Sequence, residues 1–192
     1  MPQISRPNRP AKARQGSHAT RLTAAIAVAP ILAAALGGIG HTQSIPQPSV
    51  EKAGSATVKV VNFTADWCGN CQKMNPRLED AVARFDTGEV AVINLDLTNS
   101  QSDDEDERIA TFETAITTAD ANGVSYLWDW YGGLTGLAVL VSGDNGEPIS
   151  CANSSLSADE IEGRLREALV LTLRAPAGSR KPNGPDCPPP LG

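Results

Sequence analysis

The sequence predicts an α/β fold for residues 57–175, in which a central mixed β-sheet is flanked by helices. Runs of β-branched and apolar residues, typical of strands, alternate with segments whose apolar residues recur at helical spacing. Their order is strand, helix, strand, helix, strand, strand, helix. The first strand–helix–strand unit implies a right-handed parallel crossover, and the turn residues 144–147 favour an antiparallel hairpin. The sheet is therefore expected to be mixed.

The first unit begins with residues 58–63, whose β-branched and apolar character predicts a buried strand. Residues 69–85 are expected to form a helix, because their apolar side chains share one helical face. These are Met74, Leu78, Ala81, Val82 and Phe85. Gly88 follows that helix, and residues 90–97 are apolar enough to form the second strand.

The second half starts with five consecutive acidic residues, 103–107. We expect them to begin a helix, because carboxylates near a helix N-terminus are stabilised by the helix dipole. A calcium loop is the alternative, but the run has neither a glycine nor alternating ligand spacing. Ile109, Phe112 and Ile116 continue a helical face.

Two strands and a helix complete the predicted domain. Residues 137–141 form the third strand, and residues 148–150 begin its hairpin partner. Ser157 and Glu160 have the spacing of a capping box and open the last helix. Its expected buried face consists of Ile161, Leu165, Ala168, Leu169 and Leu173.

Residues 1–41 form a basic and then apolar leader. The first 21 residues carry five basic side chains and no acid, and residues 22–40 are uncharged. This pattern is typical of a signal peptide, and also of an N-terminal membrane anchor. The apolar run is near the lower limit of about 17 residues for a span, so both interpretations stay open. A disordered Ala-rich tail on a cytosolic protein is a third alternative.

The remaining segments outside the domain are a linker and a tail. Residues 42–56, rich in Ser, Pro and Gly, are predicted to be the linker, and the proline-rich residues 176–192 an irregular tail. With the leader, this organisation predicts an extracytoplasmic protein, periplasmic or otherwise secreted, or anchored in an inner membrane.

Charge and histidine content exclude several function classes. Residues 51–192 carry all 22 acidic but only 11 of the 16 basic side chains, which gives a net charge of −11. Such an acidic domain argues against nucleic acid as a partner. The two histidines, His18 and His41, lie in or beside the leader. The predicted domain therefore lacks the imidazole needed for Cys–His or Ser–His catalysis and for a His-bearing zinc site.

The strongest functional signal is the sequence Cys68–Gly69–Asn70–Cys71, which directly follows the first strand. A helix N-terminus carries about +0.5 charge and favours a thiolate, the nucleophile of disulfide exchange. Two intervening residues let both sulfurs meet within one turn, so the pair can cycle between dithiol and disulfide. We expect Cys68 to be the exposed attacking thiol and Cys71 the resolving thiol. The exchange needs no cofactor, and no metal site is predicted.

These residues resemble the thioredoxin superfamily, which has a tryptophan where Trp67 stands and a helix-kinking proline where Pro76 stands. Residues 63–68 (FTADWC) and 94–99 (NLDLTN) are more specifically similar to the C-terminal thioredoxin-like domain of the bacterial DsbD-type thiol:disulfide interchange reductases. The resemblance covers about residues 56–175.

The resemblance implies a thioredoxin-like fold and a thiol–disulfide oxidoreductase that acts on protein disulfides. It also implies that a separate membrane thiol protein donates the electrons. Trp67 would shield the cysteines, and Gly69 and Asn70 would shape the turn between them. Asn70 stands where common thioredoxins have proline. The sequence does not decide between reductase and oxidase, because the direction depends on the compartment and on the partner's potential.

Two positions depart from the family pattern. Asn62 stands where the family has a buried acid that helps to move the proton of the resolving thiol, and an amide cannot take up a proton. Slower release of the mixed disulfide is therefore expected. Ala138 stands where the family has a cis-proline that faces the cysteines. A cis bond before a non-proline residue costs about 2.5–4 kcal/mol, so we expect a trans loop and weaker substrate docking there.

Residues 126–131 (YLWDWY) hold four of the chain's eight aromatic residues. They could form a platform near the cysteines that grips a partner, or they could pack against the sheet, which is the commoner role of clustered aromatics. A platform would fit an alternative function, a redox-inactive thioredoxin-like binding module that uses this segment as its contact surface.

Cys151 and Cys187 complete the set of four cysteines. In an oxidising compartment they could form a structural disulfide that ties the tail to the sheet edge. Free thiols remain an alternative. A zinc site that combines them with Cys68 and Cys71 is disfavoured, because zinc sites usually present two pairs of closely spaced ligands.

Overall fold

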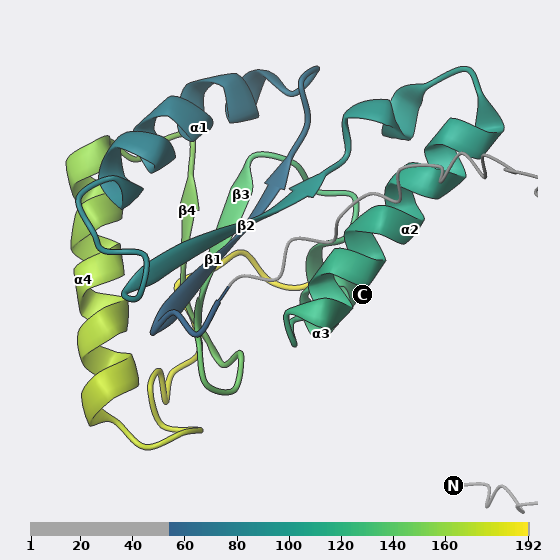
Figure 1. Cartoon of the computed structure of the whole chain (residues 1–192). Coiled ribbons are helices and arrows are strands. Elements are labelled where there is room, and N and C mark those ends of the chain that lie inside the picture. The colour runs from purple at the N-terminus through teal and green to yellow at the C-terminus, as the bar shows by residue number, and fades with distance from the viewer. Residues whose placement is uncertain (1–53, 192) are drawn as a thin grey trace, which may run out of the picture. The chain divides into compact units, whose positions relative to one another are not determined.

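The computed structural model describes residues 54–191, whose arrangement is shown in Figure 1. Its elements are β1 (Val58–Thr64), α1 (Gly69–Val82), β2 (Val90–Asp96), the 3-10 helix η1 (Thr98–Gln101), α2 (Glu105–Ala121), α3 (Tyr126–Tyr131), β3 (Leu137–Ser142), β4 (Pro148–Asn153) and α4 (Ala158–Arg174). This order confirms the predicted succession and adds η1 and α3. The leader predicted for residues 1–41 and most of the linker predicted for 42–56 lie outside the described residues. In the described part, no helix is long and apolar enough to cross a membrane.

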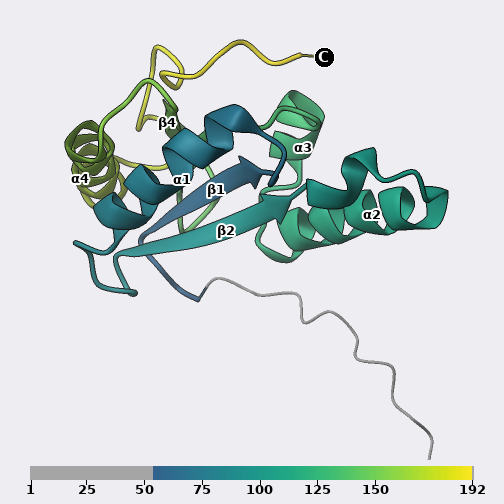
Figure 2. The same ribbon diagram turned by 90° about the horizontal axis from the view of Figure 1, so that it is seen from above.

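The sheet is mixed, as predicted, with the strand order β2-β1-β3-β4. β1 pairs in parallel with β2 and antiparallel with β3, and β3 pairs antiparallel with β4. The parallel pair results from the crossover through α1, and the β3–β4 pair from the predicted hairpin. Figure 2 shows α1 and α4 on one side of the sheet and α2 and α3 on the other.

Successive side chains of β1 point to opposite faces of the sheet, so they contribute to two apolar layers. Val58 and Val60 pack with residues of α1 and α4. Val61 and Phe63 pack with residues of α2 and α3, in the cluster that also contains the Cys68–Cys71 pair. The sheet therefore carries a core on each face, and β1 delivers the cysteines to one end of it.

Two predicted helix faces were wrong in part. In α2, Ala115 and Ala119 are buried and Phe112 packs beside them, whereas Ile109 and Ile116 are exposed. The small alanines let this helix lie close to the sheet. In α4, Leu173 is exposed, whereas the other four residues of the predicted face are buried. The capping box at the start of α4 is present, and the acidic run before α2 supplies its N-cap and first turn.

The tail is irregular in most of its length, but it is attached to the edge strand β4. Cys151 of β4 is disulfide-bonded to Cys187, with 5.0 Å between their Cα atoms. A parallel β-bridge joins the neighbouring residues Ser150 and Asp186. The tail thus covers part of the outer edge of β4.

Arg180 is the tail's most buried polar residue, with 4% of its surface exposed. Its guanidinium donates to both carboxylate oxygens of Asp144, in the β3–β4 turn, at 2.7 and 2.6 Å. The sequence does not predict this ion pair, because an arginine in a proline-rich segment is ordinarily exposed to solvent.

The Arg180–Asp144 pair predicts a specific pH dependence. The guanidinium holds the pKa of the Asp144 carboxyl well below its usual range, which is about 3.9 in an unfolded chain. A lowered folded-state pKa adds stability that is present above about pH 4 and is lost as the pH falls. We expect Asp144→Asn to lower the unfolding free energy by about 1 kcal/mol at neutral pH, and we expect a smaller deficit near about pH 2, where the carboxyl of the unfolded chain is protonated. Urea unfolding at both pH values measures this; an equal deficit at both would contradict it.

Candidate active site

Cys68 and Cys71 are joined by a disulfide, with 5.2 Å between their Cα atoms. The chain leaves β1, turns through Ala65 and Asp66, and enters α1 with Cys68 as its N-cap. The backbone N–H of Cys71 donates to Cys68 Sγ at 3.0 Å. Once the disulfide is reduced, the same N–H and the helix N-terminus would stabilise negative charge on Cys68 Sγ.

The two cysteines differ in accessibility. Cys68 is 6% exposed and Cys71 only 1%. Cys71 Sγ lies 3.9 Å from the backbone oxygen of Phe63, inside the apolar layer that β1 shares with α2 and α3. A reacting thiol or disulfide can therefore reach Cys68 more easily than Cys71; the attacking and resolving roles stay predictions.

The other residues expected to shape the site lie around the turn. Trp67 is 42% exposed, and its indole N–H donates to the backbone oxygen of Thr98 at 2.9 Å. Asn70 accepts a hydrogen bond from the Ser154 hydroxyl at 3.1 Å. Gly69 has no heavy atom within 4 Å of where a Cβ would lie, so sterics do not require glycine there. Pro76 lies inside α1.

Gly136, which the sequence analysis did not single out, faces the cysteines. A Cβ on Gly136 would lie 2.7 Å from Asn70 Cβ and 3.6 Å from Cys68 Sγ. Its φ of +80° belongs to the left-handed region, and its N–H donates to the backbone oxygen of Phe63 at 2.9 Å. A glycine just before a predicted strand was the available signal.

Ala138 lies elsewhere than its family position suggested. It pairs with Asn62 across β1 and β3, and it packs in the layer under α1 and α4 rather than with Cys68 and Cys71. In the described residues no peptide bond is cis. The loop surface beside Cys68 is therefore formed by the backbone of Gly136.

Substitution of Gly136 by alanine is expected to lower the unfolding free energy by about 2 kcal/mol, because a left-handed conformation and a contact shorter than van der Waals distance both oppose a Cβ. Gly133→Ala is the matched control, since Gly133 has φ +87° but no heavy atom near its Cβ position. Urea unfolding of the oxidised proteins gives both values. Equal losses would mean that contact with Asn70 and Cys68 adds nothing.

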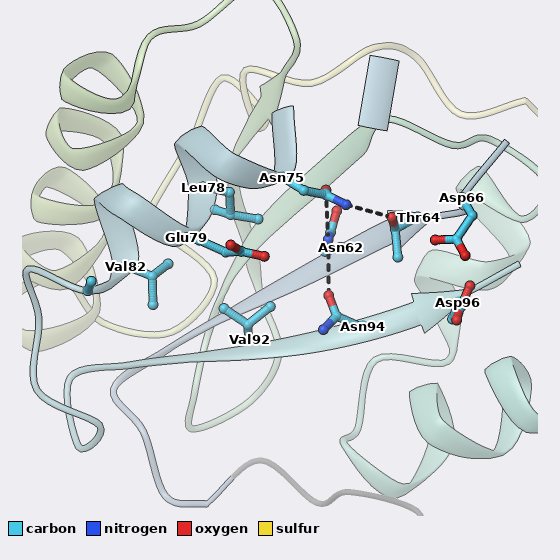
Figure 3. Close-up of a pocket in the computed structure, with 11 residues that line it drawn as sticks. Asn62, Thr64, Asp66, Asn75, Leu78, Glu79, Val82, Val92, Asn94 and Asp96 are labelled. Carbon is cyan, nitrogen blue, oxygen red and sulfur yellow. Dashed lines mark hydrogen bonds between the residues drawn. The ribbon is translucent and has the colours of Figure 1, made fainter. Parts of the chain in front are cut away.

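Asn62 is buried beneath α1 and lies in a chain of amides, shown in Figure 3. Its Nδ2 donates to Asn75 Oδ1 at 3.3 Å and to Asn94 Oδ1 at 3.0 Å. Asn75 in turn donates to the hydroxyl of Thr64 at 3.0 Å. Asn62 thus uses its amide donors structurally, which a carboxylate at this position could not do.

Asn62→Asp is expected to have two opposed effects. A carboxylate can accept the proton of the resolving thiol, so release of the mixed disulfide should accelerate. It loses the two donated hydrogen bonds, which should lower the unfolding free energy by about 1–2 kcal/mol. Stopped-flow release kinetics and urea unfolding measure these effects. Asn94→Asp is the control, because it adds a carboxylate to the same cleft without occupying the family position. An unchanged release rate in Asn62→Asp would refute the proton-transfer argument.

The aromatic segment forms α3 and packs onto the core. Leu127 and Tyr131 are buried, and Tyr131 makes an edge-to-face contact with Phe63 at a centroid distance of 6.4 Å. The Tyr131 hydroxyl donates to the backbone oxygen of Pro188 in the tail at 2.8 Å. These contacts favour the packing interpretation over an exposed platform.

All four cysteines of the chain are engaged in the two disulfides. Within residues 54–191, no cluster of three or more His, Cys, Asp or Glu side chains is placed to hold a metal ion.

The sequence matches a family model over residues 47–126, and that family is thioredoxin. The described domain has a thioredoxin-like α/β fold, in which a mixed four-stranded sheet is flanked by helices. The matched segment contains β1, α1 and both cysteines of the pair, whereas β3, β4 and α4 follow it. No curated protein matches the chain. Among solved structures, a thioredoxin-like protein from Parabacteroides distasonis is similar, with 14% identity and a TM-score of 0.37. The similarity covers 64% of this chain and 91% of that one.

The thioredoxin match and a Cys68–Cys71 pair at disulfide distance together fit a thiol–disulfide oxidoreductase.

Proposed function

We propose that this thioredoxin-like protein is an extracytoplasmic thiol–disulfide oxidoreductase that exchanges disulfides with protein substrates. The observation that carries the proposal is the Cys68–Cys71 disulfide at the start of α1, with the more exposed cysteine at the N-cap. A disulfide at a helix N-terminus yields a stabilised thiolate on reduction, which is the reactive form in exchange.

In the reductive direction, the Cys68 thiolate attacks one sulfur of a substrate disulfide. A Cys68–substrate disulfide forms, the substrate S–S bond breaks, and its other sulfur leaves as a thiolate that takes up a proton. Cys71 then loses its proton and attacks Cys68 Sγ, which releases the second substrate sulfur as a thiolate. Two electrons pass to the substrate, and the Cys68–Cys71 disulfide is the oxidised product.

The reductase direction is proposed from the similarity of residues 63–68 and 94–99 to the DsbD-type interchange reductases. In this proposal a membrane thiol protein reduces the Cys68–Cys71 disulfide again after each turnover. The basic and apolar leader, residues 1–41, supports export to the periplasm or anchoring in the inner membrane.

The reduction potential of the Cys68–Cys71 pair tests the direction. The full chain is equilibrated in redox buffers, and thiols are trapped and resolved by mass. A value near about −270 mV, as in thioredoxin, would support a reductase, whereas a value near about −120 mV would indicate a disulfide donor. A pair that does not exchange at all would refute the oxidoreductase and leave the binding module, for which the inward packing of α3 offers no support.

A further inference from the structure

A polar cleft lies between α1 and the strands β1 and β2, with a volume of about 520 Å³. Figure 3 shows its layout. One end is aliphatic and contains Leu78, Val82 and Val92, and the other end contains the carboxylates of Asp66 and Asp96. The disulfide chemistry proposed above uses none of these side chains.

The floor of the cleft presents a buried acceptor. Asn62 is 4% exposed, and among the described residues no group donates to its Oδ1. In this arrangement the Nδ2 of Asn62 donates to two acceptor oxygens, which leaves its Oδ1 without a donor in the described part of the chain. A buried carbonyl oxygen without a donor is costly, so this position favours a ligand that brings a hydrogen-bond donor.

The cleft is acidic as well as rich in acceptors. Glu79 extends from α1 toward Asn62, and Asp66 and Asp96 close one end. No lysine or arginine is among the lining residues, and no described basic side chain pairs with Glu79, Asp66 or Asp96. Three carboxylates and a buried acceptor oxygen attract a cation that carries several N–H donors.

We propose that this cleft binds an aliphatic cation, an alkylguanidinium or alkylammonium group. The alkyl stem lies along Leu78, Val82 and Val92, and the head donates to Asn62 Oδ1 and to the carboxylate of Glu79. Two sources share this chemistry: a lysine or arginine side chain of a protein partner, and a free small amine. The proposal is independent of thiol exchange.

Titration of the oxidised, ¹⁵N-labelled full chain with butylguanidinium tests the site. The side-chain amide signals of Asn62, Asn75 and Asn94 are expected to shift saturably. Butylurea has the same shape without the charge and should cause no saturable shift. Acetyl-Gly-Arg-Gly-amide separates the two sources: its binding assigns the cleft to a protein side chain, and binding of butylguanidinium alone assigns it to a free cation.

Glu79→Gln should weaken butylguanidinium binding about tenfold or more, because it removes one charge-assisted hydrogen bond. Glu79 is exposed, so the variant should fold. Glu113→Gln, which removes the same charge from an exposed position on α2, should bind like the wild type. The proposal is overturned if butylguanidinium shifts none of the three amides, if butylurea binds equally well, or if Glu79→Gln and Glu113→Gln have the same affinity. The readout requires no turnover, so failure here leaves the oxidoreductase proposal intact.

Discussion

Cys71→Ser is expected to convert the protein into a trap that accumulates a covalent adduct with a disulfide substrate through Cys68. Cys68→Ser should form no adduct and should reduce disulfides only at the uncatalysed background rate. The reason is the asymmetry of the site: Cys68 occupies the N-cap of α1 and receives the Cys71 N–H, whereas Cys71 is almost fully buried beside Phe63. Attack from outside therefore falls to Cys68, and Cys71 acts only after the mixed disulfide has formed.

Intact-mass analysis after incubation of each reduced variant with insulin measures the adducts, and insulin turbidity measures the rates. Both variants retain Cys151 and Cys187, so each serves as the control for reaction at that second pair. An adduct in Cys68→Ser that is absent from Cys71→Ser would assign the attack to the other sulfur and contradict the proposed roles.

The elements predicted best are those whose packing follows directly from periodicity. In β1, buried residues on both faces give an apolar, β-branched run, and in α1 the residues Met74, Leu78 and Ala81 are buried as predicted. The capping box before α4 also follows from local chemistry, because Ser157 and Glu160 satisfy each other's backbone donors. Such features need only neighbouring residues, which a sequence displays.

Two features that depend on contacts between distant segments were missed. The α2 face was misassigned, because Ile109 and Ile116 are more hydrophobic than Ala115 and Ala119, yet close approach to the sheet selects the smaller side chains. The ion pair between Arg180 and Asp144 joins residues 36 apart.

In the candidate active site, too, local features were predicted and features that depend on distant contacts were not. The Cys68–Cys71 pair and its helix N-terminus were predicted from one short motif. The approach of Gly136 to Cys68 depends on how the loop before β3 returns to the end of β1, which a glycine before a predicted strand does not by itself reveal. Family comparison pointed instead to Ala138, whose side chain faces the opposite layer.

The tail disulfide should contribute more to stability than the disulfide of the active site. We expect Cys151→Ala combined with Cys187→Ala to lower the unfolding free energy by about 2–4 kcal/mol. The bridge closes a loop between residues 36 apart, and opening it restores that chain entropy to the unfolded state. It also detaches the tail from the edge of β4, where Ser150 and Asp186 pair. Alanine rather than serine avoids an unpaired hydroxyl at the buried Cys151 position.

Cys68→Ala combined with Cys71→Ala is the matched control, because that disulfide spans a separation of only 3 residues. Loop-closure entropy grows with the logarithm of loop length, so the two double variants should differ by about 2 kcal/mol. Urea unfolding under non-reducing conditions gives both free energies. If removal of the Cys151–Cys187 bridge left the stability unchanged, the tail would be held by Arg180 and its other contacts, and the disulfide would not be structural. A deficit larger in the tail variant than in the control would instead show that the long loop, and not disulfide bonding in general, stabilises this domain.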